Sequence, residues 1–177
     1  MPVNIEIKAR VENIEVLKVK IVNLYNIKAH EIFQTDTFFN VEKGRLKLRA
    51  FSKDNGELIF YERNNSAGPK RSDYFVYKTD NPDELKKLLE ISLGIRGIVR
   101  KKRLLYLVGN TRIHLDEVDN LGSFLELEVI LNPKQTENEG KQIAKDFMQK
   151  LDIKKKDLID LAYIDLLKKQ NLSKEIQ

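Results

Sequence analysis

Charged residues recur at every second position in several short segments of the sequence. They are Arg45, Lys47 and Arg49; Lys101 and Arg103; Arg112, His114 and Asp116; Glu126 and Glu128; and, near the start, Glu6 and Lys8. Alternate residues of a strand share one face and lie roughly 6.5–7 Å apart. Arginine forks match phosphate oxygens, and paired carboxylates hold divalent cations that bridge such oxygens. If the strands face a common space, this pattern predicts a metal–polyphosphate site.

The alternative reading of the same pattern is a solvated sheet surface. Antiparallel sheets commonly have one buried and one solvent-exposed face, and alternating charge on a single strand is typical of the exposed face. Here the signs are segregated, with cations on some strands and carboxylates on others, whereas a plain surface intersperses them. The segregation favours a charged interior over a charged exterior.

The amino-acid composition limits the catalytic and metal-binding groups that the chain can supply. The chain has 177 residues, 41% of them hydrophobic, which predicts one domain with a real core. The formal net charge of +5 allows an anionic partner, whether nucleic acid, a phosphate metabolite or an acidic protein. It has no cysteine and only two histidines, His30 and His114. This excludes disulfides, thiol nucleophiles, iron–sulfur clusters and multi-histidine zinc sites. A metal is therefore expected to be held by oxygen, as Mg²⁺ or Mn²⁺.

Two periodicities divide the sequence into elements. Alternation predicts strands over 4–11, 30–41, 45–52, 57–63, 72–79, 97–108, 111–118 and 123–131, and helical spacing predicts helices over 14–25, 81–93 and, broken near 152–155, 136–170. The pair Asn55-Gly56 predicts the turn of a hairpin. We expect one domain over residues 1–170 and a short polar tail over 171–177.

These elements predict an α+β fold: an eight-stranded antiparallel closed β-barrel with flanking helices and a helical C-terminal tail. The helices need apolar faces to cover, and the candidates are Ile5/Ile7, Leu46/Leu48 and Leu125/Leu127/Val129. If these face outward, the charged faces turn inward. An interior lined with cations requires water, counter-charge or an anionic ligand, because unpaired buried charge costs several kcal/mol per ion.

Six motifs occur in an order that resembles the CYTH, or triphosphate tunnel metalloenzyme, superfamily, and within it the branch related to class IV adenylyl cyclases. They are Asn4-Ile5-Glu6-Ile7-Lys8, Arg45-Leu46-Lys47-Leu48-Arg49, Lys101-Lys102-Arg103, Leu115-Asp116-Glu117-Val118, Leu121-Gly122-Ser123-Phe124 and Leu125-Glu126-Leu127-Glu128. The resemblance covers about residues 3–167, where 162–167 fits the closing helix. Asn4 replaces the first glutamate of the Glu-x-Glu-x-Lys signature, which weakens the case for a second metal ion.

The resemblance implies roles for these residues. Glu6, Glu126 and Glu128 are implied metal ligands, with Asp116 a ligand or an orienter of metal-bound water. The implied phosphate-binding residues are Lys8, Arg45, Lys47, Arg49, Lys101, Arg103 and Arg112, among which Lys8, Arg45 and Arg112 are the implied catalytic cations. His114 lies between Arg112 and Asp116 on the same face, where it is either a proton carrier or a polar tunnel residue.

Three functions remain open at this point. The first is an enzyme acting on a triphosphate: a cyclase converting ATP to cyclic AMP and pyrophosphate, or a triphosphatase using thiamine triphosphate, tripolyphosphate or a nucleoside triphosphate. The second is a non-catalytic polyphosphate- or nucleotide-binding module. The replacement of the first signature glutamate by Asn4 supports this alternative. A nucleic-acid partner is disfavoured, because the aromatic stacking platform of single-strand binders is missing. The sequence has no apolar signal core, so we expect a cytoplasmic monomer or homodimer without a membrane partner.

Overall fold

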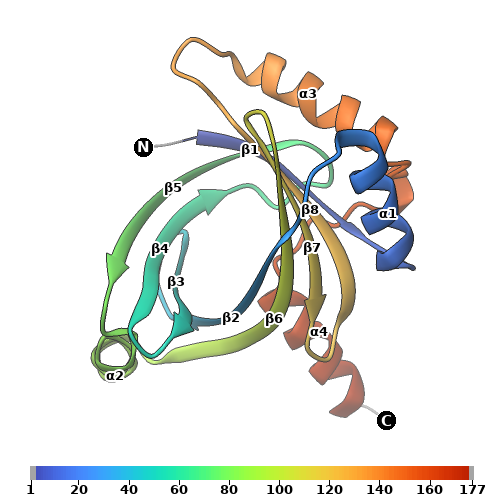
Figure 1. Ribbon diagram of the computed structural model, residues 1–177. Helices are drawn as coiled ribbons and strands as arrows, with labels where there is room; N and C mark the ends of the chain where they lie inside the picture. The colour runs from blue at the N-terminus through green and yellow to red at the C-terminus, as the bar shows by residue number, and fades with distance from the viewer. Residues whose placement is uncertain (1–2, 176–177) are drawn as a thin grey trace.

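The computed structural model describes residues 3–175, with side chains over residues 3–171, as eight antiparallel strands and four α-helices. The strands close into one barrel in the order β1-β5-β4-β3-β2-β6-β7-β8 (Figure 1). Their bounds are β1 Val3–Arg10, β2 His30–Phe39, β3 Arg45–Ser52, β4 Asn55–Arg63, β5 Lys70–Thr79, β6 Ile95–Val108, β7 Thr111–Val118 and β8 Gly122–Ile130. The predicted α+β class and the closed eight-stranded barrel are confirmed.

The apolar faces predicted to lie outside the barrel face outward, and helices cover them. Ile7 and Leu127 pack in one cluster with Ile21 of α1 (Ile14–Tyr25) and Met148 of α3 (Glu137–Lys150). α2 (Pro82–Leu93) contacts the β2–β4 side, where Leu48 is buried. Because side chains alternate along a strand, an apolar outer face turns the charged face of the same strand inward.

The β3–β4 hairpin differs from its prediction. Ser52 pairs with Asn55, so the turn consists of Lys53 and Asp54, and Asn55-Gly56 begins β4. Gly56 is required by a close approach instead: a Cβ there would lie 2.9 Å from the carbonyl oxygen of Arg49 and 2.9 Å from Cβ of Pro82. The glycine therefore lets the start of α2 lie against the hairpin.

The C-terminal segment closes one end of the barrel. After α3 the chain turns at Asp152, which adopts a left-handed φ of 56°, and a short 3₁₀ turn follows at Lys155–Asp157. Leu158 then pairs with Ala9 of β1. The break between the helices is thus longer than predicted, because this stretch is tied to the barrel and α4 begins only at Tyr163.

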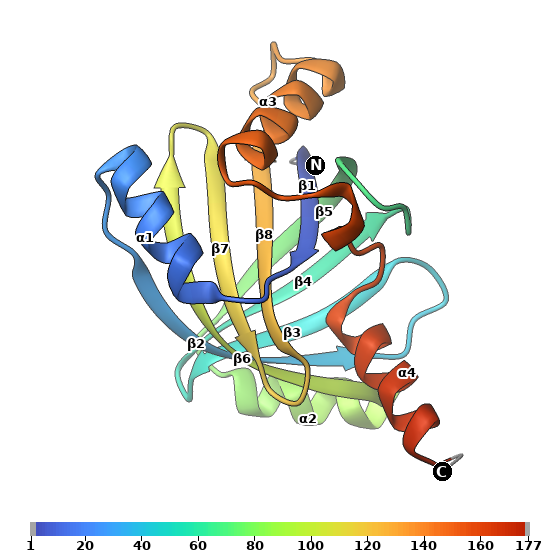
Figure 2. The ribbon, with the colours of Figure 1, turned by 90° about the vertical axis from the view of Figure 1, so that its right-hand side faces the viewer.

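α4 (Tyr163–Glu175) lies at the barrel end where β2 finishes (Figure 2). Its Ile164 packs so closely on Gly97 of β6 that any side chain at position 97 would clash with it. Residues 171–175 of the expected polar tail continue this helix, and 176–177 lie outside the described residues. Within residues 3–175 no helix has both the length and the apolar character needed to cross a membrane.

Candidate active site

A cavity of about 360 Å³ occupies the barrel interior, and all eight strands contribute to its wall. Nine of the sequence-predicted site residues line it: Glu6, Lys8, Lys47, Arg49, Lys101, Arg103, Arg112, Glu126 and Glu128. The other two, Arg45 and Asp116, are not among its lining residues. The structure therefore brings the predicted cations and carboxylates into one enclosed space.

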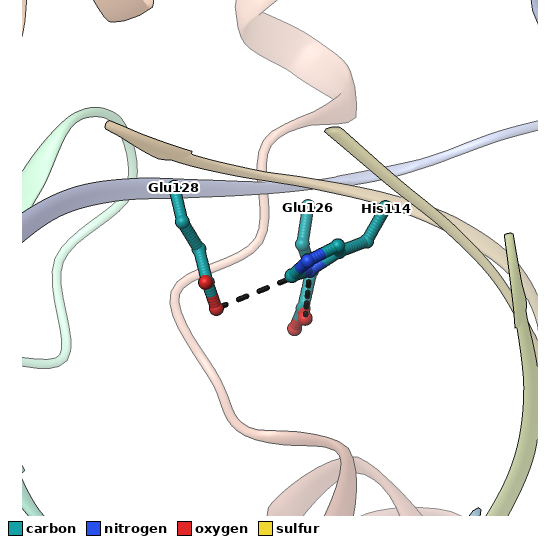
Figure 3. Close-up of side chains that lie close together, drawn as sticks. All are labelled: His114, Glu126 and Glu128. Carbon is teal, nitrogen blue, oxygen red and sulfur yellow. Dashed lines mark ion pairs between the residues drawn. The ribbon is translucent and has the colours of Figure 1, made fainter. Parts of the chain in front are cut away.

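Glu126, Glu128 and His114 form a cluster on neighbouring strands (Figure 3). Glu126 of β8 lies directly opposite His114 of β7. The Nδ1 atom of His114 is 3.8 Å from Oε2 of Glu126 and 3.9 Å from Oε1 of Glu128, and one ligand atom from each residue lies within 4.8 Å of the others. Distances of this kind leave room for an ion between the three side chains.

His114 Nδ1 is buried and has no hydrogen-bond partner. Burial, helped by the Arg103 guanidinium, lowers the pKa of His114, which keeps the imidazole neutral near pH 7. A neutral imidazole nitrogen facing two carboxylates is a ligand set that fits a divalent cation. The structure thus adds a nitrogen donor to the all-oxygen site expected from the sequence.

Each carboxylate of this cluster already faces a cation. Glu126 lies 2.8 Å from Nζ of Lys8 and 2.5 Å from Nη2 of Arg103, and Glu128 lies 3.0 Å from Nε of Arg112. Burial alone would raise the pKa of Glu126, but the surrounding lysines and Arg103 outweigh it and hold that pKa well below its usual range. Both carboxylates are therefore ionised at neutral pH.

Asp36 of β2 holds two of the predicted phosphate-binding cations. Arg49, its direct cross-strand partner, donates from Nε at 2.9 Å and from Nη2 at 3.1 Å. Lys47 donates from Nζ at 2.8 Å. Sequence reasoning missed Asp36, although it shares the inward parity of Gln34, which donates to it at 3.2 Å.

Asp116 of β7 repeats this arrangement on the other side of β6, the strand that separates β7 from β2. Arg103, again the direct cross-strand partner, donates from Nε and from Nη2, both at 2.6 Å, and Lys101 donates from Nζ at 2.8 Å. The side chain of Asp116 is completely buried. The tunnel thus carries two neighbouring lysine–arginine pairs, each fixed by one aspartate.

Tyr163, the first residue of α4, joins this second cluster. Its hydroxyl donates to Oδ2 of Asp116 at 3.0 Å. The Nζ atoms of Lys8 and Lys101 lie 3.5 Å and 4.8 Å from its ring centroid, within the range of cation–π attraction. No sequence signal within the strands could have placed this ring, because it comes from the closing helix.

Glu6 and Arg45 have partners that the sequence did not indicate. Glu6 forms an ion pair with Arg63 of β4 and is not part of the His114 cluster. Arg45 is 3.1 Å from Oδ2 of Asp165 in α4, which also pairs with Arg96. Arg63 could have been predicted to face the barrel interior, because it lies two residues after Tyr61 on the same face of its strand. Asp165 could not, because it lies on α4.

Other charged residues of the strands face away from the cavity. Within Arg100-Lys101-Lys102-Arg103, Arg100 is exposed and Lys102 is half-buried, whereas Lys101 and Arg103 line the cavity. Arg71 is exposed and pairs with Asp73 and Glu137 on the outer surface. The basic run is therefore split by strand parity and forms no continuous patch.

Lys47 should make phosphate binding sensitive to alkaline pH. Burial, together with Arg49, lowers the pKa of Lys47 to about 8. Phosphate favours the charged lysine, so binding takes up a proton once the pH exceeds this pKa, and affinity falls. We expect the affinity for tripolyphosphate to drop between pH 7 and 9, and the drop to shrink in Lys47→Arg. Calorimetric titration across this range would measure it; an equal drop in both proteins would contradict the assignment.

Asn4 lies in the cavity wall with its Oδ1 atom buried and without a hydrogen-bond partner. Asn4→Glu adds a negative charge at this position, and hard divalent cations respond to the number of charged ligands. We expect the variant to bind Mn²⁺ more tightly than the unaltered protein without substrate. Electron paramagnetic resonance of free Mn²⁺ during titration would show it. Unchanged affinity would place Asn4 outside the influence of the ion.

Comparisons with known proteins agree with this geometry. The CYTH domain family model matches residues 3–163. Among solved structures, the PH1012 protein of Pyrococcus horikoshii OT3 superposes with a TM-score of 0.82 at 27% identity, covering 92% of this chain and 98% of that one. A candidate adenylate cyclase of Vibrio parahaemolyticus gives 0.79 at 16% identity, covering 93% and 97%. A Hippeastrum candidate adenylyl cyclase with a dominant triphosphatase activity gives 0.67 at 14%, covering 96% of each. No curated protein matches the sequence significantly.

Proposed function

The chain belongs to the CYTH domain family, and from this membership and its tunnel we propose that it is a divalent-metal-dependent enzyme that cleaves a triphosphate inside the barrel. One observation carries the proposal. The same cavity is lined by two aspartate-held lysine–arginine pairs and by the Glu126–Glu128–His114 cluster. A polyphosphate with a bridging cation is the ligand whose charges complement both sets.

Mg²⁺ or Mn²⁺ would be held by Glu126, Glu128 and His114. When bound, such an ion neutralises part of the charge on the phosphoryl oxygens. Glu6, also expected as a ligand, contacts Arg63 in the structure, and we propose that it acts as an outer charge near the ion. Magnesium and manganese are the expected ions because two of these three donors are carboxylates.

For Asp116 we propose a positioning role. Its two oxygens accept hydrogen bonds from Lys101, Arg103 and Tyr163, so they have little capacity left for an ion. A buried carboxylate in this position fixes the direction in which both cations point. Asp36 has the same role for Lys47 and Arg49.

The catalytic work of the chain is electrostatic. Phosphoryl or nucleotidyl transfer spreads negative charge over phosphate oxygens, and fixed cations stabilise it without a protein nucleophile. We propose that Lys8 and Arg112 contact these oxygens, turning from their partners Glu126 and Glu128 when substrate is bound. Arg45, which does not line the cavity, contributes its charge from the closed end, where Asp165 holds it.

The first candidate reaction is that of a class IV adenylyl cyclase. The ribose 3′-oxygen attacks the α-phosphorus of ATP, the bond to the β-phosphate oxygen breaks, and cyclic AMP and pyrophosphate form. The second is hydrolysis, in which water attacks the terminal phosphorus, the bond to the bridging oxygen breaks, and the shortened chain leaves while orthophosphate forms. In the second reaction His114 would have a different role: with the ion held by Glu126 and Glu128 alone, its neutral imidazole can accept a proton from water.

Product identification tests the proposal. The purified protein is incubated with ATP, thiamine triphosphate or tripolyphosphate, with Mg²⁺, with Mn²⁺ or with a chelator. Cyclic AMP with pyrophosphate supports the cyclase, and orthophosphate supports the triphosphatase. Binding of triphosphate without any product would replace the enzyme by a binding module. Product formation that persists in chelator would contradict the metal centre.

A further inference from the structure

One aromatic ring of the closing segment enters the cavity. Tyr163, the first residue of α4, lines the cavity wall and is only 5% exposed. Its hydroxyl donates to Oδ2 of Asp116 at 3.0 Å, and its ring centroid lies 4.9 Å from that of Phe124. Contacts within the protein therefore fix the ring, and no ligand is needed to place it.

Two lysines of the cavity lie against this ring. The Nζ atom of Lys8 is 3.5 Å from the ring centroid, and that of Lys101 is 4.8 Å from it. Lys8 also lies 2.8 Å from a carboxylate oxygen of Glu126. Lys101 lies 2.8 Å from one of Asp116. Both lysines are buried, and the attraction of an ammonium to an aromatic face increases where water is excluded. Each ammonium thus has a charged and an aromatic partner.

The two carboxylates differ in what else they are proposed to bind. Asp116, the partner of Lys101, is not one of the proposed metal ligands and stays with its lysine. Glu126, the partner of Lys8, belongs to the proposed metal cluster. A metal ion that engages Glu126 competes with Lys8 for its oxygens. In the metal-loaded protein the ring is then the partner that Lys8 keeps.

We infer that Tyr163 is a positioning residue for Lys8: its ring holds the Lys8 ammonium in place once a metal ion has engaged Glu126. The inference goes beyond the proposed function and rests on it. A lysine side chain without a partner samples many rotamers, and ordering it opposes the binding of an anion. The ring removes this cost, because Lys8 is ordered before a phosphate oxygen reaches it.

A role in packing alone predicts a different outcome. The ring belongs to the apolar cluster that seats α4, together with Phe124 and Ile164. If it only seats the helix, its removal loosens the end of the barrel and lowers the affinities for metal ion and anion together. If it positions Lys8, the anion affinity falls and the metal affinity does not. The fall is then largest with metal bound, because Glu126 still holds Lys8 in the metal-free protein.

The test uses tripolyphosphate with methylene groups in place of its bridging oxygens, which cannot be cleaved, titrated calorimetrically into the full chain with and without saturating Mn²⁺. In Tyr163→Leu we expect the affinity for this analogue to fall about tenfold with Mn²⁺ and about twofold or less without it, in keeping with the rotamer freedom of one lysine. Tyr163→Phe keeps the ring and should retain the affinity to within about threefold. Electron paramagnetic resonance should show that Mn²⁺ affinity without the analogue does not fall in either variant.

Lys8→Met tests the link between the two side chains directly. In that background the ring has no Lys8 ammonium to hold, so adding Tyr163→Leu should cost little further affinity for the analogue. An undiminished cost there would overturn the inference. So would equal losses in Tyr163→Leu and Tyr163→Phe, or a parallel loss of Mn²⁺ affinity.

Tyr25→Leu is the matched control. Tyr25 of α1 lies against Phe147 of α3, with ring centroids 5.7 Å apart, and does not line the cavity. The same substitution there should leave both affinities unchanged. If Tyr163→Leu melts early by circular dichroism, Tyr163→Met fills the space without a ring and gives the same comparison. Failure of the unaltered protein to bind the analogue with Mn²⁺ would overturn the proposed function as well, whereas the outcomes above overturn the inference alone.

Discussion

Glu128→Gln is expected to lower Mn²⁺ affinity and metal-supported turnover by about a hundredfold or more. Carboxylate charge is the main source of affinity for a hard cation. Replacing a residue that only orients a metal ligand already lowers metal affinity roughly 10–100-fold, so replacing a ligand should cost at least as much. Glutamine keeps the size of the side chain, so the loss reports the charge. Initial rates against Mn²⁺ and Mg²⁺ concentration, with a direct Mn²⁺ titration by electron paramagnetic resonance, would measure both effects.

Glu117→Gln is the matched control for this experiment. Glu117 lies on the adjacent strand β7, but its side chain is exposed on the outer face. The same substitution there should leave metal affinity and turnover within about twofold, as surface changes usually do. Similar losses from the two substitutions would remove Glu128 from the metal centre.

Asp116→Asn is expected to destabilise the fold by about 3–5 kcal/mol at pH 7, the usual effect of breaking a buried ion pair from one side. The substitution removes the charge that faces Lys101 and Arg103 while nearly preserving shape. Chemical unfolding of the ligand-free protein measures the loss. Asp119→Asn, at an exposed position on the following turn, is the control and should cost little.

The cost of Asp116→Asn should also depend on pH. Burial would raise the pKa of the Asp116 carboxyl, but Arg103 and Lys101 outweigh it and lower that pKa in the folded protein. A lowered folded pKa gives stability that is present above the unfolded value, about 3.9, and that is lost as the pH falls toward the folded pKa. The difference in the free energy of unfolding between the variant and the unaltered protein should therefore be largest at pH 7 and decrease below about pH 4. A difference independent of pH would contradict the charge-based explanation.

The barrel and much of its lining could be predicted because strand parity is a local property. Once Leu46 and Leu48 are assigned to the outside, Lys47 must point inward, and the structure agrees. The same rule could have revealed Asp36 and Arg63, but their segments show no repeated charge. Parity says nothing about partners on distant strands, so the Glu6–Arg63 pair was not foreseen.

Two features were beyond the reach of local patterns. Tyr163 reaches Asp116 across 47 positions, and only the path of the closing segment brings them together. The expected hairpin is present, but its turn lies at Lys53-Asp54 and not at Asn55-Gly56, where Gly56 instead packs closely against Pro82. In both cases the deciding contact is made by a helix whose docking position depends on the finished barrel.

The pairing of the cluster carboxylates with Lys8, Arg103 and Arg112 has a thermodynamic consequence. Anything that engages the carboxylates releases cations for an anion, and anything that engages the cations releases carboxylates for a metal ion. Linkage requires each ligand to raise the affinity of the other by the same factor. If the tunnel holds both ligands as proposed, we expect each to bind weakly alone and the two to bind cooperatively.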